Sequence, residues 1–391
     1  MPHVPQAARG ALSLPPSTFV AFRDQIRAQA AAGTLIPLHL GDTLLPPPAA
    51  ARALDLEEAA LHRYGPIAGF EPLREAVAED FTRAGLACAA AEVTITPGAT
   101  GALDVAIDAV VEPGDEVLVL TPSWPLIFGI ASRRGALRQV PVSEHGGLPD
   151  PETLAARVAA AITPRTVAIY WSDPNNPVGF VLSSAHRDAL YALAEAHGLW
   201  VVVDAVYADL VFAHDDPPLA DYAGVRRART FVAVSYSKRF GIAGHRVGAL
   251  CSPPDLAELS TRLVTYTTYH ASHAGQRMAL NVFGHDPGAA REAWHGLARR
   301  GRDVVCEALA EAGLPHTRPE GGAFVFLDLR ELAPDGEAAL ALMHRGLERG
   351  VSLAPGAAFG DDYSRFARLC YTAVEPEQVV EGIQRLRAAW T

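Results

Sequence analysis

The chain of 391 residues carries 33 lysines and arginines against 44 aspartates and glutamates, a formal net charge of −11. This acidic balance, without a basic run, argues against a nucleic-acid-binding role, and no apolar run approaches the ~20 residues of a membrane-spanning helix. An apolar content of 49% indicates a globular protein, long enough for two domains. The four cysteines form no CxxC pair and the first ten residues hold no signal-peptide core, so we expect no metal site and a cytoplasmic location.

From about Glu92 the sequence alternates between predicted strands and helices. Several of the strands are apolar on both faces, which is typical of a parallel sheet covered by helices on both sides. Strands are predicted at 93–96, 116–121, 167–171, 199–204, 230–235 and 246–251, and helices at 100–111 and 182–197. The class is therefore α/β, with ligands expected at the carboxyl ends of the strands.

The pattern changes after about Asn281, where longer helices alternate with isolated strands. Helices are predicted at 287–312, 336–349 and 376–390, and strands at 323–329 and 365–371. We expect a large domain over 45–280 and a smaller α+β domain over 281–391, with residues 1–44 joining the smaller domain as an N-terminal arm. The prolines at 46–48 mark the junction.

Lys238 is the one lysine of the chain, and the other 32 of its 33 basic residues are arginines. Arginine replaces lysine at most surface positions, but only lysine can lose its proton and act as a nucleophile. Ser235 and Ser237 precede Lys238, and Arg246 follows it. Two hydroxyls and a guanidinium suit a phosphate dianion, so the sequence predicts a reactive amine beside a phosphate.

This segment, 235–248, resembles the lysine motif of the class I/II aminotransferases, which are fold-type I enzymes dependent on pyridoxal 5'-phosphate (PLP). The resemblance extends from about Pro37 to the end of the chain and implies a three-layer large domain with a mostly parallel sheet, plus a smaller α+β domain. It implies that Lys238 forms the internal aldimine and moves the proton between substrate and cofactor. It also implies that Ser235, Ser237 and Arg246 bind the phosphate; His245 stands where many relatives have tryptophan.

Asp204 and Tyr207 follow a predicted strand that is apolar on both faces. A carboxylate at this point can keep a pyridine nitrogen protonated, although an aspartate at a strand end often only caps a turn. The spacing to Lys238 is similar to that of the family. The resemblance therefore implies a catalytic role for Asp204, and a hydrogen bond from Tyr207 to the phenolic oxygen of PLP.

Three further motifs resemble the cofactor-binding segments of the family. In 97–103 a glycine turn precedes a helix, whose N-terminus can bind an anion, and the resemblance assigns Ala99 and Thr100 to the phosphate. In 121–125 it implies that Trp124 stacks on the PLP ring and borders the substrate. In 173–179 it implies that Asn176 contacts both the phenolic oxygen and the substrate carboxylate, whereas the segment alone would be an ordinary turn.

The remaining motifs concern the substrate and a second subunit. Arg368 matches the family arginine that binds the substrate carboxylate. Arg365 is a nearby competitor, which strand alternation places on the opposite face. Gly41 belongs to a segment that resembles the family's loop near the substrate. Tyr64 matches a tyrosine that reaches the phosphate of the neighbouring subunit. The resemblance thus implies a homodimer with shared active sites; otherwise Tyr64 is a surface tyrosine.

We therefore expect an aminotransferase that moves an amino group from an amino acid to a 2-keto acid with ping-pong kinetics. An alternative is a β/γ-eliminating carbon–sulfur lyase, because the same cofactor residues serve both reactions. A ligand-binding regulatory protein is a third possibility, disfavoured by the full catalytic set. Thr100 replaces a lysine that one acidic-substrate branch uses, and Arg262, His270 and His273 are candidates for contacting the substrate across the interface.

Overall fold

The computed structural model describes residues 9–12, 14, 22–143, 147–212 and 224–391, so parts of the predicted N-terminal arm lie outside the described residues. The largest element is a seven-stranded sheet of order β1-β7-β6-β5-β4-β2-β3. Its strands are β1 (Val93–Thr96), β2 (Glu116–Thr121), β3 (Ala136–Pro141), β4 (Thr166–Ser172), β5 (Trp200–Asp204), β6 (Thr230–Ser235) and β7 (Gly248–Cys251). The pairs among β3, β2, β4, β5 and β6 are parallel, whereas β7 runs antiparallel to both β1 and β6.

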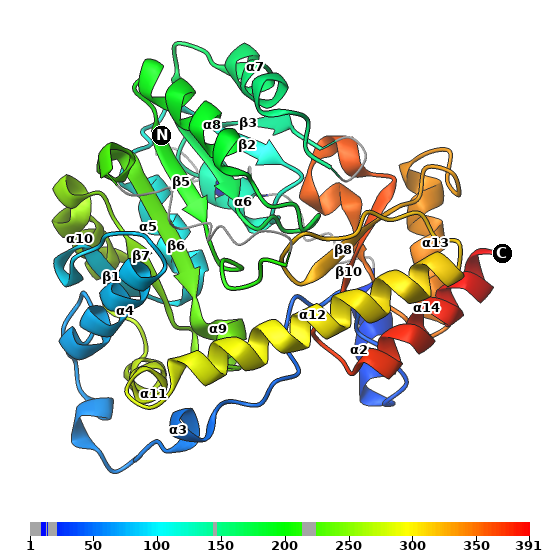
Figure 1. The fold of residues 1–391 in the computed structure, drawn as a ribbon, viewed down its shortest axis with the longest axis horizontal. Coiled ribbons are helices and arrows are strands. Elements are labelled where there is room, and N and C mark those ends of the chain that lie inside the picture. Colours follow the sequence, from blue (N-terminus) through cyan, green and yellow to red (C-terminus); the bar gives the residue numbers. More distant parts are fainter. Residues whose placement is uncertain (1–8, 13, 15–21, 144–146, 213–223) are drawn as a thin grey trace, which may run out of the picture.

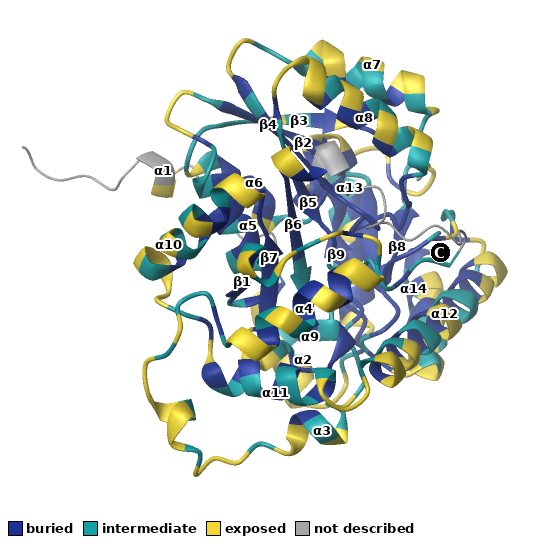
Figure 2. Cartoon of the chain, turned by 60° about the vertical axis from the view of Figure 1, so that its left-hand side comes forward, coloured by how far each residue is buried: buried dark blue, intermediate teal, exposed yellow. Residues whose placement is uncertain are grey.

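Apolar side chains on both faces of this sheet explain its three-layer build. In β2, Leu118 and Leu120 join the core on one face, while Val117 and Val119 join the core on the other. Successive strand residues point to opposite faces, so a strand that is apolar throughout needs cover on both. The first face is covered by α4 (Glu71–Arg83), α7 (Pro151–Ala161), α8 (Ser184–Ala196) and α11 (His273–Phe283), and the second by α5 (Gly98–Asp108), α6 (Leu126–Ser132) and α10 (Ala257–Thr267). Figure 2 shows the buried sheet between helices whose outer faces are exposed.

A second, smaller sheet has the order β8-β10-β9 and is antiparallel. Its strands are β8 (Phe324–Asp328), β9 (Ala354–Pro355) and β10 (Phe366–Cys370). A separate core forms around it, with α12 (Pro287–Glu311), α13 (Gly336–Glu348) and α14 (Pro376–Trp390). The long helix α12 runs from beside α11 to the side of α14, and so links the two parts (Figure 1).

The short helices α1 (Arg9–Leu12), α2 (Arg23–Ala31), α3 (Ala49–Arg52) and α9 (Tyr236–Arg239) complete the described α-helices. Ile36, in the segment after α2, pairs with Val351 beside the small sheet. The chain therefore contacts the small-sheet region before it enters the large sheet. The division into domains at residues 45 and 281 remains a prediction. Among the described helices, none has both the length and the apolarity needed to cross a membrane.

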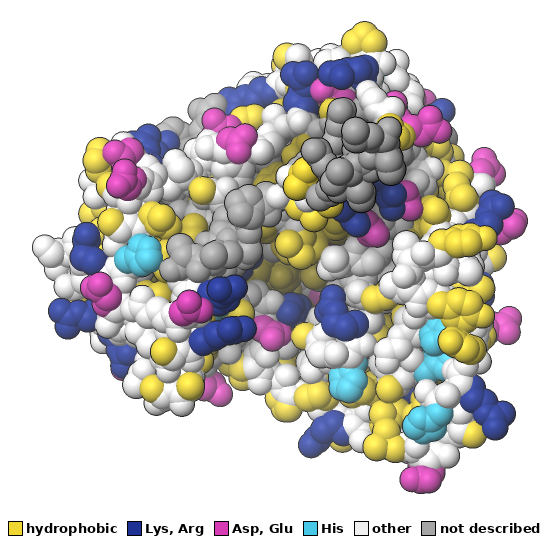
Figure 3. Space-filling model, turned by 180° about the vertical axis from the view of Figure 1, so that it is seen from behind, with side chains coloured by type: hydrophobic (Ala, Val, Ile, Leu, Met, Phe, Trp, Pro, Cys, Tyr) yellow, Lys and Arg dark blue, Asp and Glu magenta, His cyan; other side chains and the backbone are white. Residues whose placement is uncertain are grey.

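The predicted α/β class is confirmed, and several strand bounds agree with the sequence to within a residue. The strand expected at 246–251 instead begins at Gly248, because Arg246 adopts a left-handed backbone conformation with φ 51°. The edge strand β3 was not predicted, since its sequence ALRQVP mixes polar and apolar residues. Figure 3, a view from behind, shows charged side chains of both signs interspersed among the described residues of that face.

Candidate active site

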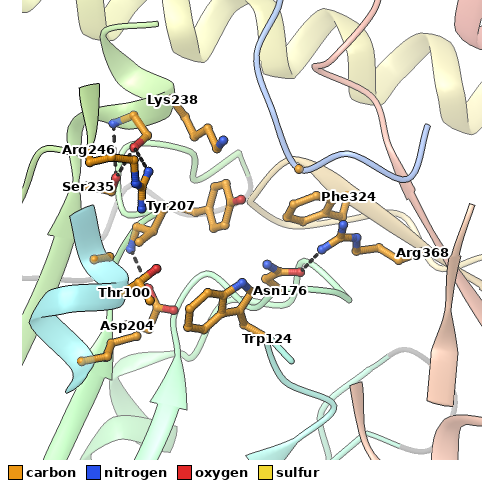
Figure 4. A pocket seen from close by; sticks show the side chains of 15 residues that line it. Thr100, Trp124, Asn176, Asp204, Tyr207, Ser235, Lys238, Arg246, Phe324 and Arg368 are labelled. Carbon is orange, nitrogen blue, oxygen red and sulfur yellow. Dashed lines mark hydrogen bonds between the residues drawn. The ribbon is translucent and has the colours of Figure 1, made fainter. Parts of the chain in front are cut away.

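A pocket lies where the carboxyl ends of the parallel strands face the small sheet. Fifteen residues line it, and they include twelve of the thirteen to which the resemblance assigns a role toward the cofactor or the substrate (Figure 4). The twelve are Gly41, Ala99, Thr100, Trp124, Asn176, Asp204, Tyr207, Ser235, Ser237, Lys238, Arg246 and Arg368. Leu103, Val206 and Phe324 complete the lining.

One end of the pocket gathers groups that suit an anion. Ser235 ends β6 and caps α9, where its Oγ accepts a hydrogen bond from the Ser237 amide (3.2 Å) and donates to the Ser237 Oγ (2.9 Å). The left-handed turn at Arg246 brings its Nη1 to 3.5 Å from the Ser237 Oγ. Gly98, which begins α5, has φ 72°, a backbone conformation that favours glycine, and the site of its missing Cβ lies 2.7 Å from the Arg246 Nη2, so the helix N-terminus and the guanidinium lie close together here. Backbone amides, hydroxyls and a guanidinium together form an anion cradle.

Lys238 lies beside this cradle and has a partner that the sequence did not suggest. Its Nζ donates to the Asp42 Oδ1 at 3.1 Å, in an ion pair whose Lys238 side chain is 18% exposed. The Thr372 hydroxyl donates to the Asp42 carbonyl at 2.7 Å and so anchors this loop to the end of β10. The ion pair therefore fixes the position of the Lys238 amine at the pocket.

Asp204 ends β5 and forms a buried acidic group in the pocket. It is 6% exposed and accepts hydrogen bonds from the Tyr170 hydroxyl (3.1 Å) and the Val206 amide (3.2 Å). Burial raises the pKa of the Asp204 carboxyl to about 6, and these two hydrogen bonds offset the effect only in part. No cationic side chain of the described residues forms an ion pair with it, so a ligand with an N–H donor would complete its environment.

Aromatic rings form the walls between these groups. The Tyr207 ring meets the Phe324 ring edge-on at a centroid distance of 5.4 Å, and burial raises the pKa of the Tyr207 hydroxyl. Trp124 lies across the pocket from Lys238 (Figure 4). A flat aromatic ligand would fit between such walls.

Arg368 occupies the far end of the pocket, in the middle of β10. Its Nη1 donates to the Asn176 Oδ1 (3.0 Å) and its Nη2 to the His39 carbonyl (2.7 Å), while its Nε has no partner among the described residues (Figure 4). The guanidinium carbon lies 4.2 Å from the centroid of the Phe324 ring. Burial lowers the pKa of Arg368, whose partners are neutral oxygens, so a carboxylate ligand would supply the missing charge. The competitor Arg365 points elsewhere and donates to the exposed Pro334 carbonyl.

Among the residues that the resemblance assigns to the cofactor or the substrate, Tyr64 is the one that the single chain does not bring into the pocket. It is 83% exposed and its ring packs against Tyr269 at a centroid distance of 5.0 Å. The His270 and His273 rings, which stack at 4.3 Å, lie beside it and also outside the pocket lining, as does Arg262. A role for these residues therefore requires a second chain.

Four residues near the pocket received no individual role from the sequence. Asp42 holds Lys238, Tyr170 holds Asp204, His39 holds Arg368 through its carbonyl, and Phe324 stacks on Arg368. Phe324 follows a Gly-Gly pair that resembles a landmark of the family. His39 and Asp42 flank Gly41, in the loop that the resemblance places near the substrate, so the sequence pointed to their segment but not to these two side chains. Their contacts, and that of Tyr170, join segments distant in the chain.

Comparisons with known proteins agree with this geometry. Residues 34–386 match the family of class I and II aminotransferases. The chain is 34% identical over 339 residues to the aspartate/prephenate aminotransferase of Thermus thermophilus, covering 83% of this chain and 82% of that protein. It is 35% identical over 330 residues to the arginine–pyruvate transaminase of Pseudomonas aeruginosa, covering 83% and 81%. The solved structure of Thermus thermophilus aspartate aminotransferase with maleate matches with a TM-score of 0.88 at 30% identity, over 99% of this chain and 100% of that one.

The fold and the pocket define an enzyme of the aspartate aminotransferase fold. The chain belongs to the class I and II aminotransferase family, and it is an aminotransferase. The alternative of a carbon–sulfur lyase finds no support in these relatives, whose names are those of aminotransferases.

Proposed function

We propose that the chain transfers the amino group with PLP held in this pocket, anchored on Lys238. The donor set fits the group: the cradle of Ser235, Ser237 and Arg246 suits its phosphate, and the buried carboxylate of Asp204 suits its pyridine nitrogen. Ala99 and Thr100 at the N-terminus of α5 would add to the phosphate site. When bound, PLP supplies an electron sink for the bond broken at the substrate α-carbon.

Orientation of the ring would fall to Trp124, Asn176 and Tyr207. Trp124 would stack on one face of the ring, and the Tyr207 hydroxyl and the Asn176 amide would donate to its phenolic oxygen. Asp204 would keep the pyridine nitrogen protonated. Its raised pKa in the ligand-free chain supports this role, because a buried carboxylate without a cation gains most from an N–H partner.

Lys238 would both hold the cofactor through its amine and act as general base. Once a substrate displaces it, the free Nζ would take the proton from the substrate α-carbon and deliver it to the cofactor carbon. Asp42, whose Oδ1 lies 3.1 Å from Nζ, would hold the amine beside the pocket in the protonated form that it has between taking the proton and returning it. A displaced lysine would otherwise be free to rotate.

Arg368 would bind the α-carboxylate, supported by Asn176 and by the close approach of Gly41. A Cβ at Gly41 would lie 3.1 Å from the Phe324 ring, so a glycine keeps this space open. Both the amino acid and the 2-keto acid carry this carboxylate, so one arginine would serve both half-reactions, as ping-pong kinetics require. The amino acid remains unassigned.

We also infer a homodimer in which Tyr64 reaches the phosphate of the neighbouring subunit. The Tyr64 ring is exposed and packs against Tyr269 and His270, which supports a contact surface for a second copy of the chain. Tyr269 has φ 67°, an unusual backbone conformation for a tyrosine.

The cytoplasmic location remains a prediction.

One observation carries the proposal: the single lysine of the chain lies in a pocket between an anion cradle and a buried arginine. The test is borohydride reduction of protein incubated with PLP, followed by peptide mass spectrometry. We expect a single modified peptide that contains Lys238, and loss of the imine absorption band in Lys238→Ala.

A panel of single amino acids added to the loaded protein would then identify the donor from release of its keto acid. Lys238→Ala should lose turnover while it still retains PLP through the phosphate cradle. Full turnover by this variant, or no trapped cofactor in the native chain, would contradict the proposal.

A further inference from the structure

Two of the four cysteines lie side by side, outside the pocket. The Sγ atoms of Cys88 and Cys251 are 2.7 Å apart, although 163 residues separate them in the chain. Cys88 lies in the loop between α4 and β1, and Cys251 is the last residue of β7, which pairs with β1. Cys306 and Cys370, by contrast, belong to the core around the small sheet.

The two thiols differ in their access to solvent. Cys251 is fully buried, whereas Cys88 is partly exposed and borders a surface depression beside Glu79 and Arg83 on α4. A reagent in solution therefore meets Cys88 first, and Cys251 can react only with what Cys88 becomes. Cys88 therefore suits the role of the attacking thiol, and Cys251 that of the resolving thiol.

The polar groups around the pair also bear on its chemistry. The Arg227 Nη2 donates to the Cys251 Sγ at 3.0 Å and to the Glu92 Oε2 at 2.9 Å. Burial, and the contact with Cys88, raise the pKa of the Cys251 thiol, an effect that Arg227 reduces. The atoms of Cys88, Glu92 and Cys251 lie close enough together to ligate a soft divalent metal. The guanidinium already supplies a positive charge to both Glu92 and Cys251, which favours thiol chemistry over a metal ion.

We propose that Cys88 and Cys251 form a reversible disulfide when the protein meets a hydroperoxide. The Cys88 sulfur attacks one peroxide oxygen, the O–O bond breaks, and Cys88 becomes a sulfenic acid while water or an alcohol leaves. The Cys251 sulfur then attacks the Cys88 sulfur, and the hydroxyl leaves with the Cys251 proton as water. The two sulfurs together lose two electrons, which the peroxide takes up.

The position of the pair indicates what the bridge would do. β1 ends at Thr96, just before the cradle residues on α5, and β7 begins two residues after Arg246. The two strands pair directly with each other, and Cys251 ends β7 opposite Val93, the first residue of β1, while Cys88 lies in the loop that leads into β1. A bridge there would fasten the strands that carry the cradle without displacing a pocket residue. We therefore expect a more stable protein that keeps its aminotransferase activity.

The test uses the purified chain of 391 residues, treated with hydrogen peroxide, blocked with a thiol-alkylating reagent and mapped without reduction. We expect the free thiols to fall from four to two, a mass loss of about 2 Da, and one peptide pair linking Cys88 to Cys251, all reversed by dithiothreitol. The melting temperature of the oxidised protein should exceed that of the reduced protein by roughly 3–6 °C.

Single-cysteine variants make the assignment specific. Cys88→Ser should lose both the linked peptide and the oxidation-dependent rise in melting temperature, and Cys306→Ala, the matched control, should keep both. Should Cys251→Ser fail to fold, Cys88→Ser carries the test alone. The proposal is overturned if peroxide leaves four free thiols, if Cys88 oxidises to a sulfinic acid without a linked peptide, or if bound zinc protects the pair.

Discussion

Buried charged side chains differ in their partners: those outside the pocket form ion pairs, whereas those inside it have neutral partners. Arg187 is fully buried beneath the loop that follows β4, and its Nη1 donates to the Asp173 carboxylate at 3.1 Å. Arg368 is also buried, yet its described partners are a neutral carbonyl and an amide oxygen. Two arginines of similar burial thus have opposite electrostatic environments.

The buried aspartates repeat this contrast. Burial alone would raise the pKa of Asp80, but the hydrogen bond from Arg239 and the charges of Arg239, Arg291 and Arg83 lower it below its ordinary value. No described cation forms such a contact with Asp204, and burial raises its pKa to about 6. A buried charge without a counter-ion lowers the stability of the folded chain. A ligand of opposite charge or with a matching hydrogen-bond donor would remove this cost at the pocket. Unpaired buried charges therefore mark the active site, and paired ones mark the scaffold.

The largest expected effect comes from Asp204→Asn. We expect the aminotransferase activity to fall on the order of 10³-fold, because the amide cannot hold a pyridine nitrogen protonated with its charge. The ligand-free variant should nevertheless be more stable than the ligand-free native chain above pH 6, on the order of 2–3 kcal/mol. Urea denaturation of both proteins across pH 4 to 8, beside steady-state kinetics, measures the two effects.

The sign follows from the raised pKa of Asp204. Below pH 4 the carboxyl is protonated in both the folded and the unfolded chain, so the two proteins should agree there. Between about pH 4 and pH 6 the unfolded chain ionises this group while the buried native carboxyl resists ionisation, so the native chain loses stability that the amide keeps, and the loss is complete above pH 6. Asp80→Asn is the matched control, since it should destabilise the protein at pH 7; stabilisation by both variants would contradict the contrast.

Arg187→Met should give the next largest effect, and on stability. Removing this partner leaves the Asp173 carboxylate buried without its charge, which costs about 3–5 kcal/mol. Methionine fills much of the vacated volume, so the loss reports the charge and not a cavity. We expect a lower melting temperature, while kcat of the protein that remains folded stays near the native value.

The same substitution at Arg368 should separate stability from activity in the opposite way. Arg368→Met removes an uncompensated buried cation, so the melting temperature of the ligand-free protein should stay the same or rise. The kcat/KM for the amino acid should fall by about 10²- to 10³-fold, because two charge-assisted hydrogen bonds to the carboxylate are lost. Equal destabilisation by Arg187→Met and Arg368→Met would remove the distinction between the two regions.

The sequence predicted a role for Arg368 but could not show that its partners among the described residues are neutral oxygens. Local patterns were enough for the apolar strands and for the Ser235–Ser237–Lys238 turn, because these depend on residues close together in the chain. Pairing across 192 residues places Asn176 on Arg368, and 196 residues separate Lys238 from Asp42. No local pattern encodes such contacts, nor the antiparallel direction of β7, which depends on how the segments pack. Tyr64 also remains a prediction, because its proposed partner is a second chain.

The smallest effect concerns how Arg368 is held in place. His39 accepts from Arg368 through its carbonyl, and its ring Nδ1 lies 2.6 Å from the Ser352 Oγ. Burial, with a further contribution from the charge of Arg368, lowers the pKa of His39 to about 4, so its ring is neutral at pH 7 and adds no second cation beside Arg368. Ser352→Ala removes this hydrogen bond at a cost of about 1 kcal/mol and should raise the KM for the amino acid about 5-fold with little change in kcat. Because Ser352 is remote from the proposed lysine base, a fall in kcat at constant KM would contradict a positioning role, and Ser352→Thr, which keeps the hydroxyl, should restore the native KM.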